Sequence, residues 1–112
     1  VTGHVTGRSA VPEAGRSRYP DCYYTAGFRV DENAAAGIPP VITLILPGFL
    51  DRRVTPEDGF GVGDRLRVTV VEFETLEESA QSVRIADTLG EVTSPWYWCF
   101  LAEKLPPQGV TR

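Results

Sequence analysis

The stretch RLRVTVVEF, residues 65–73, decides the fold class, because polar and apolar side chains alternate along it. A period of two places successive side chains on opposite faces of a β-strand. The side chains expected to face a core are Leu66, Val68 and Val70, and those expected to face solvent are Arg65, Arg67 and Thr69. The sequence GVGD at 61–64 predicts a tight turn into this strand, since glycine adopts the positive φ that such turns need.

Further stretches carry strand patterns on either side. Residues 22–30 alternate, which places Cys22, Tyr24, Ala26, Phe28 and Val30 on one face of a half-buried strand. The run VITLIL at 41–46 is rich in β-branched residues and bounded by prolines, as expected for a strand covered on both faces. Residues 1–10 and 96–101 add an opening and a closing strand.

One short helix is predicted after the strand at 65–73. The sequence TLEE at 75–78 matches a capping box, with Thr75 as N-cap and Glu78 at the third helical position. Leu76, Ala80 and Val83 then form a partial apolar stripe that ends before residues 87–90. A helix of about two to three turns is stable only when it packs on a partner.

These elements indicate an all-β fold with one short helix. We expect a single domain, residues 1–112, that forms a small antiparallel OB-like β-barrel of about five strands. Closure into a barrel removes the exposed edges that an open sheet of this size would leave. A small β-sandwich is the alternative.

Composition excludes several classes of protein. The hydrophobic share of 42% suits a folded domain rather than a disordered chain. The longest apolar run, 41–46, falls far short of the roughly 20 residues of a membrane helix, so membrane insertion is not expected. The net charge of −4, with acids and bases interspersed, argues against nucleic acid as a partner, because phosphate binding needs a basic face.

Catalytic and metal-binding patterns are missing from the sequence. His4 is the only histidine, and no Gly-x-Ser-x-Gly turn presents a nucleophile. Carboxylates cluster at 72–78, where a solvated helix start explains them without a sugar cleft. The glycines at 59, 61 and 63 precede a strand and lack a following Lys-Ser or Lys-Thr, so they form a turn. We therefore expect no enzyme activity, no cofactor and no metal site.

Two short motifs are candidates for ligand binding. Trp96-Tyr97-Trp98 would place both indoles on one face of a strand, where coplanar rings could stack on sugars; the alternative is that one of them fills the interior. Arg52 and Arg53 could grip an anion or a carboxylate, although adjacent strand residues point to opposite faces. The alternative for this pair is that it pins a loop through salt bridges and hydrogen bonds.

Four motifs occur in order along the chain: YPDC at 19–22, DRRVTP at 51–56, GDRLRV at 63–68 and SPWYW at 94–98. In this pattern the chain resembles a β-barrel domain of secreted or envelope-facing bacterial proteins, often joined to an SGNH-type domain similar to alginate O-acetyltransferases. The resemblance implies an accessory, non-catalytic role outside the cytoplasm. The catalytic neighbour is absent here, and residues 84–92 are less acidic than in that family, which puts acetyl transfer and any ligand site there in doubt.

Export also bears on the two cysteines. The chain begins at Val1 and contains no methionine, which is compatible with removal of a signal peptide, with a trimmed chain, or with an unusual source composition. Cys22 and Cys99 are either separate buried thiols or a disulfide closing a long loop. We predict the disulfide, because the first and last strands of a barrel tend to meet at closure and exported thiols oxidise.

The sequence thus leads to two functional hypotheses. The first is an extracytoplasmic structural or interaction module that binds a protein partner or self-associates, for example as a surface or filament subunit. The second is a polysaccharide-binding accessory domain that uses Trp96, Tyr97 and Trp98.

Overall fold

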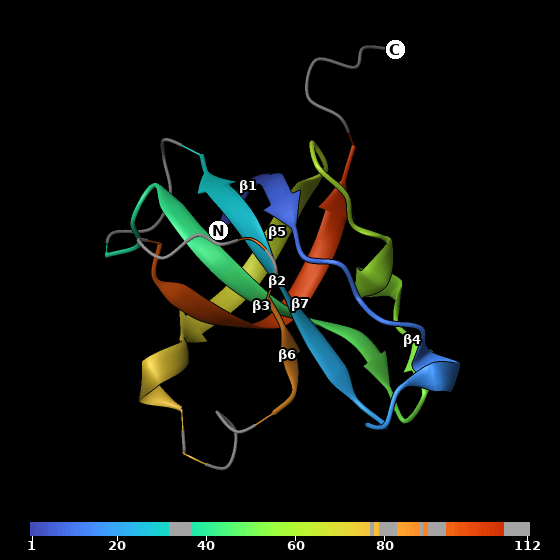
Figure 1. Ribbon diagram of the computed structural model, residues 1–112. Coiled ribbons are helices and arrows are strands. Elements are labelled where there is room, and N and C mark those ends of the chain that lie inside the picture. The colour runs from blue at the N-terminus through green and yellow to red at the C-terminus, as the bar shows by residue number, and fades with distance from the viewer. Residues whose placement is uncertain (32–36, 77, 79–82, 88, 90–93, 107–112) are drawn as a thin grey trace.

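Seven β-strands and three 3₁₀ turns make up the described part of the computed structural model, which covers residues 1–31, 37–76, 78, 83–87, 89 and 94–106 (Figure 1). The strands are β1 (Thr2–Arg8), β2 (Cys22–Val30), β3 (Val41–Leu50), β4 (Arg53–Val54), β5 (Arg65–Glu72), β6 (Ile85–Ala86) and β7 (Trp96–Leu105). The turns are η1 (Ala14–Arg16), η2 (Pro56–Gly59) and η3 (Phe73–Thr75). The expected β-rich fold is confirmed.

The seven strands form one mixed sheet in the order β4-β3-β7-β5-β1-β2-β6, with an additional pairing between β2 and β3. Because of that pairing, five strands follow one another in a closed cycle: β1, β2, β3, β7, β5 and back to β1. The expectation of an antiparallel sheet is wrong in two places, since β3 runs parallel to β7 and β2 runs parallel to β6. Side-chain alternation is the same in both orientations, so it could not reveal this.

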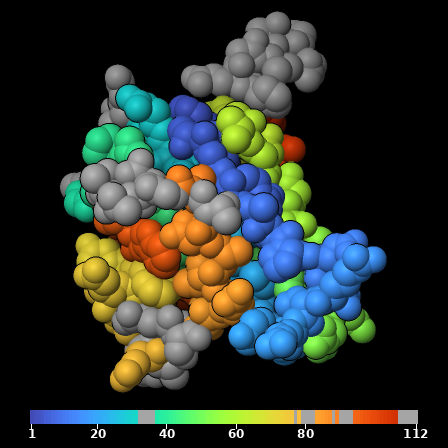
Figure 2. Space-filling view, viewed as in Figure 1, coloured from blue at the N-terminus to red at the C-terminus, as the bar shows by residue number. Residues whose placement is uncertain are grey.

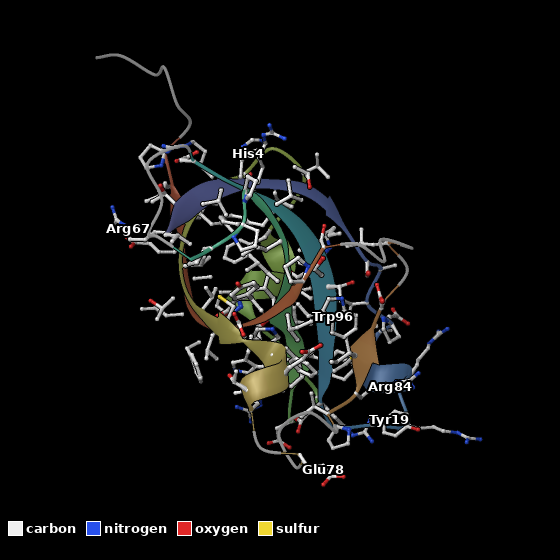
Figure 3. All side chains as sticks on the ribbon, turned by 90° about the vertical axis from the view of Figure 1, so that its left-hand side faces the viewer. His4, Tyr19, Arg67, Glu78, Arg84 and Trp96 are labelled. Atoms are coloured by element: carbon white, nitrogen blue, oxygen red, sulfur yellow. The ribbon has the colours of Figure 1, made fainter. Side chains whose placement is uncertain are left out.

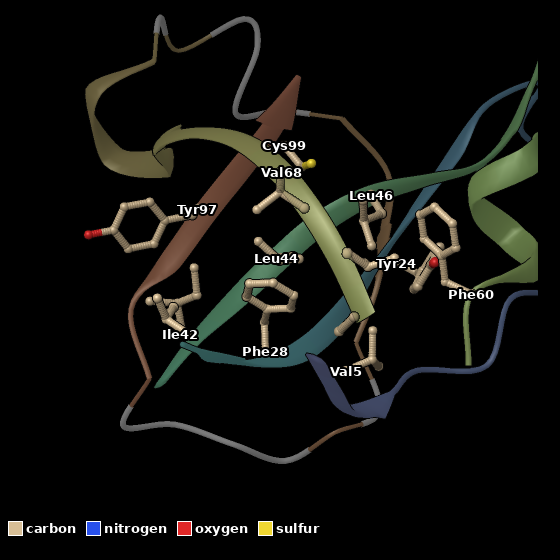
Figure 4. Packing of buried hydrophobic residues seen from close by; sticks show 13 residues of the cluster. Val5, Tyr24, Phe28, Ile42, Leu44, Leu46, Phe60, Val68, Tyr97 and Cys99 are labelled. Atoms are coloured by element: carbon tan, nitrogen blue, oxygen red, sulfur yellow. The ribbon is translucent and has the colours of Figure 1, made fainter. Parts of the chain in front are cut away.

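The core lies inside the cycle of strands, where alternate side chains of each strand converge (Figure 4). The predicted inner faces are confirmed for most positions: Tyr24, Ala26 and Phe28 from β2 meet Leu66 and Val68 from β5 in one buried cluster. The prediction is wrong for Cys22, which is buried outside this cluster, because the register shifts between Cys22 and Tyr23. Arg67 and Thr69 are exposed on the opposite side of β5. Burial of such a set of apolar side chains is the main favourable contribution to folding.

Strand β3 is covered on both faces, as its run of β-branched residues predicts. Ile42, Leu44 and Leu46 join the inner cluster, while Thr43 and Ile45 are buried on the other face. Beside β2 the sheet continues into β6, whose residues Ile85 and Ala86 pair with Tyr23 and Tyr24, and in Figure 2 this segment (orange) lies beside the N-terminal segment (blue). It is tied there by Thr25 on β2, whose hydroxyl donates to Asp87 Oδ1 at 2.8 Å.

Arg8, at the end of β1, holds η2 against one end of the core. Its guanidinium donates to the carbonyl oxygens of Asp58 at 2.6 Å and Phe60 at 2.8 Å, and forms an ion pair with the Asp58 carboxylate at 3.0 Å. The same guanidinium lies 4.1 Å from the centre of the Tyr24 ring, and the Tyr24 hydroxyl donates to the Glu57 carbonyl. Arg8 therefore joins three segments far apart in sequence.

The capping box at 75–78 does not start a helix in the way that the sequence predicts. Residues 73–75 form the 3₁₀ turn η3, and Thr75 Oγ1 donates backwards to the Glu72 carbonyl at 2.7 Å instead of capping a helix. The remainder of the predicted helix falls largely on residues 77 and 79–82, which lie outside the described residues. Within the described ranges no helix is long and apolar enough to cross a membrane.

The predicted disulfide is wrong. Cys22 and Cys99 are both buried and unbonded. Cys99 on β7 belongs to the inner cluster, whereas Cys22 begins β2 outside that cluster, and β3 separates the two strands in the sheet. The pairing of β2 with β3 closes the cycle, so β2 and β7, the strands that carry the cysteines, do not meet, and the premise of the prediction fails.

Candidate functional site

The motif Trp96-Tyr97-Trp98 occupies the first residues of β7, where the strand pairs with β3 on one side and β5 on the other. Tyr97 points into the core and is 5% exposed. Trp96, labelled in Figure 3, and Trp98 alternate with Tyr97, so they lie on the outer face, and both are half-buried. Neither indole fills the interior, and both are available at least in part to a ligand on the outside.

The two indoles pack in an outer aromatic cluster with Tyr23 and Phe73. The ring centre of Trp98 is 4.8 Å from that of Tyr23, at an interplanar angle of 42°, and 6.3 Å from that of Phe73. Phe73 also contacts Trp96 edge-on at 5.7 Å. Such pairs contribute stability beyond the burial of their area. The rings therefore support one another and do not form a free flat platform.

Trp96 lines a small hollow of about 100 Å³ together with Glu72, Glu74 and Pro95. Burial, followed by the nearby charge of Glu72, raises the pKa of the Tyr97 hydroxyl above its usual value. The hollow thus combines one indole with carboxylates, which can accept hydrogen bonds from hydroxyl groups.

Further along β7 a β-bulge changes which side chains face solvent. Val70 pairs with Cys99 and Thr69 pairs with Leu101, so Phe100 has no partner on β5. As a result Phe100 and Leu101 are both exposed, at 63% and 67%. Strict alternation from Trp96 would place Leu101 inside, and no sequence signal identified the bulge.

Charged residues surround this pair with both signs. On the same side, Arg67 of β5 and Glu103 of β7 form an ion pair at 3.3 Å. Near the end of β7, Lys104 lies opposite Leu66 and pairs with Asp64 at 3.4 Å. We define the β5–β7 outer face as Arg67, Thr69, Phe100, Leu101 and Glu103. It consists of an apolar centre with balanced charge at its border.

The second predicted motif, Arg52 and Arg53, lies in the hairpin between β3 and β4. Asp51 and Arg52 both have positive φ, of 49° and 63°, in the two-residue turn. The Arg52 guanidinium donates to the carbonyls of Ser17 at 2.8 Å and Ala14 at 3.4 Å, while Arg53 is exposed on β4. Arg52 thus pins the loop that contains η1, the loop-pinning alternative raised for this pair.

Among the residues that the structure describes, side chains with catalytic potential are not brought together. His4 lies on β1 opposite Arg29 and Arg65, and the described residues contain no group of three metal-binding side chains. Burial raises the pKa of Cys22, and burial also raises that of Cys99 to about 11. Both thiols are therefore poor nucleophiles at neutral pH, since the thiolate is the reactive form.

Comparison with known proteins leaves the family open. No family model, no curated protein and no solved structure matches the chain. Function is therefore inferred from the residues and their arrangement.

Proposed function

We propose that this protein is a non-catalytic interaction module, built as an OB-like barrel, that self-associates through the β5–β7 outer face. Five strands that pair in the cycle β1-β2-β3-β7-β5 support the OB-like barrel, which is a five-stranded Greek-key barrel. We base the proposal of a location outside the cytoplasm on the resemblance to envelope-type accessory domains alone. The two cysteines are unbonded, so no disulfide supports that location.

The observation that carries this proposal is the exposed pair Phe100 and Leu101. Single exposed apolar residues are ordinary, but neighbouring large ones on a rigid strand favour a contact surface. The bulge that turns both outward leaves the core intact, because Cys99 and Ala102 on either side still face inward. The exposed pair is therefore not a by-product of packing inside the sheet.

The local charge balance of the β5–β7 outer face makes a second copy of the chain a suitable occupant. The whole chain carries a net charge of −4, which would make two copies repel. The β5–β7 outer face, by contrast, has its Arg67 balanced by Glu103. Two such faces related by a two-fold axis can exchange these ion-pair partners around a shared apolar centre.

Size-exclusion chromatography with light scattering over a range of protein concentrations tests self-association. We expect a dimer or larger species that the double variant F100S/L101S converts to monomer. The matched control is Val62→Ser, which removes an equally exposed side chain (69%) from the turn before β5. A wild-type monomer at about 1 mM, or equal dissociation by the control, would refute the proposal.

Carbohydrate binding remains the second candidate, and the hollow beside Trp96 favours it. A sugar ring could lie against the half-exposed indole while Glu72 accepts hydrogen bonds from its hydroxyls. Titration of tryptophan fluorescence with neutral oligosaccharides tests this, with Glu72→Gln and Trp96→Phe as variants. An unchanged spectrum at saturating sugar would exclude the site.

A further inference from the structure

The basic side chains of the protein fall into two groups. Within the described ranges, five of them form ion pairs with carboxylates: Arg8, Arg16, Arg65, Arg67 and Lys104. The remaining five form no ion pair there: Arg18, Arg29, Arg52, Arg53 and Arg84. All of the second group except Arg29 belong to three segments at one end of the molecule, which are the loop after β1, the β3–β4 hairpin and β6 with its preceding residues.

Specific contacts bring these segments together. The Arg52 guanidinium donates to the carbonyl of Ser17, immediately before Arg18. The Arg84 guanidinium lies 4.9 Å from the ring centre of Tyr19, immediately after it. Figure 3 shows Arg84 and Tyr19 side by side at this end. The loop at 17–20 is thus the link between the three arginines.

A shallow hollow of about 480 Å³ opens at this contact. Tyr19, Val83, Arg84 and Ile85 line it, and Tyr19 is 46% exposed. The lining therefore offers an aromatic ring, two aliphatic side chains and a guanidinium that also carries free N–H donors. A ligand that fits would have a flat, partly apolar body and an anionic group.

The acids nearby do not cancel this charge. Among the surrounding residues, Glu13 pairs with Arg16 at 3.1 Å, and one oxygen of Asp21 accepts the backbone N–H of Asp51 at 2.7 Å. Counted over the three segments alone, Glu13, Asp21 and Asp51 supply three carboxylates against the five guanidiniums of Arg16, Arg18, Arg52, Arg53 and Arg84. Two further acids lie at this end: Asp87, directly after β6, accepts the hydroxyl of Thr25 at 2.8 Å, and Glu78 is exposed. The three segments are therefore positive taken together, on a chain whose net charge is −4.

We infer that this end binds an anionic oligosaccharide. Its carboxylate or sulfate groups accept hydrogen bonds from Arg18 and Arg84, and the apolar face of one sugar ring packs on Tyr19. Guanidinium forks match such two-oxygen groups in geometry as well as in charge. Nucleic acid fits less well, because its dense phosphates need a broader basic face than these few arginines provide. The site lies apart from the β5–β7 outer face, so it does not depend on self-association.

Isothermal titration calorimetry tests the site with four probes: a heparin hexasaccharide for sulfate, a galacturonate hexamer for carboxylate, a neutral cello-oligosaccharide, and single-stranded DNA. We expect one or both anionic sugars to bind, with an affinity that falls as salt is raised. The neutral sugar should bind at least about tenfold more weakly, since it lacks the charged acceptors.

Variants distinguish a site from general attraction to positive charge. R18Q/R84Q should weaken binding by about tenfold or more, whereas R29Q removes an unpaired arginine elsewhere and should change it by less than about twofold. F100S/L101S should bind like wild type. Three outcomes would each overturn the inference. R18Q/R84Q and R29Q could lose the same affinity, neither anionic sugar could bind at about 1 mM, or DNA could bind more tightly than the sugars. Thermal melting of each variant checks that it remains folded.

Discussion

Strands β2 and β7 have similar lengths and similar apolar content, but they use their apolar side chains differently. Along β2, alternation continues unbroken from Tyr24 to Val30, and every second side chain is buried in the core. Along β7, alternation holds only to Cys99, after which the bulge exposes Phe100 and Leu101. An apolar side chain on β2 thus serves stability, while the two on β7 are available for contact with another molecule.

Truncation of one phenylalanine on each strand should give the largest contrast. Phe28→Ala removes a fully buried ring and should lower the free energy of unfolding by about 3–5 kcal/mol. Phe100→Ala, measured at a protein concentration low enough for the chain to be monomeric, should change it by no more than about 0.5 kcal/mol, because that ring is mostly in solvent. Urea denaturation followed by tryptophan fluorescence measures both. Similar losses in the two variants would mean that Phe100 is buried in the folded protein.

Arg8 should come next in size, because it stabilises the end of the core that η2 covers. Arg8→Met keeps most of the side-chain stem but leaves the carbonyls of Asp58 and Phe60 without their donor. We expect a loss of about 2–3 kcal/mol in the free energy of unfolding. Arg29→Met, at an arginine without an ion pair, is the control and should cost little. A loss of less than about 0.5 kcal/mol at Arg8 would contradict the role assigned to it.

Cys99 should make stability depend on pH in the alkaline range. Burial raises the pKa of its thiol to about 11 in the folded protein, against an ordinary value near 9. The unfolded chain therefore loses its proton first, and stability that is fully present below about pH 9 falls by roughly 2 kcal/mol as pH rises to about 11. Urea midpoints measured at several pH values should show a smaller decline in Cys99→Ala. An identical decline in both proteins would place the effect on other groups.

The smallest effect is expected at the other end of the pH scale. The hydrogen bond from Thr2, followed by that from Arg65, holds the pKa of Asp31 below its usual value. Its stabilising contribution is present above about pH 4 and is lost as pH falls through the lowered pKa. Because this carboxylate is partly exposed, Asp31→Asn should cost less than about 1 kcal/mol at pH 7. A pH titration by NMR of the Asp31 carboxyl carbon checks the direction of the shift.

The five long strands were predictable from the sequence because the signal is local, whereas the two-residue strands β4 and β6 are too short to leave a pattern. Alternation at 65–73 and 22–30 correctly identified inner and outer faces, and the glycines at 61 and 63 marked the turn, where Gly63 has a φ of +92°. The candidate site was only partly predictable. Alternation places Trp96 and Trp98 on one face of the strand, but neither their contacts with Tyr23 and Phe73 nor the exposure of Leu101 follows from the motif.

By itself, the sequence determined the fold class, the positions of the five long strands and the burial of β3 on both faces, since each depends on residue type and on spacing along the chain. Tertiary structure alone decided that β3 and β7 run parallel, that a bulge exposes Phe100 and Leu101, and that Cys22 and Cys99 stay apart. It also brought Arg18, Arg52 and Arg84 to one end. These features depend on which distant segments become neighbours, and hydrogen-bonded pairing between strands leaves no periodic trace in either strand.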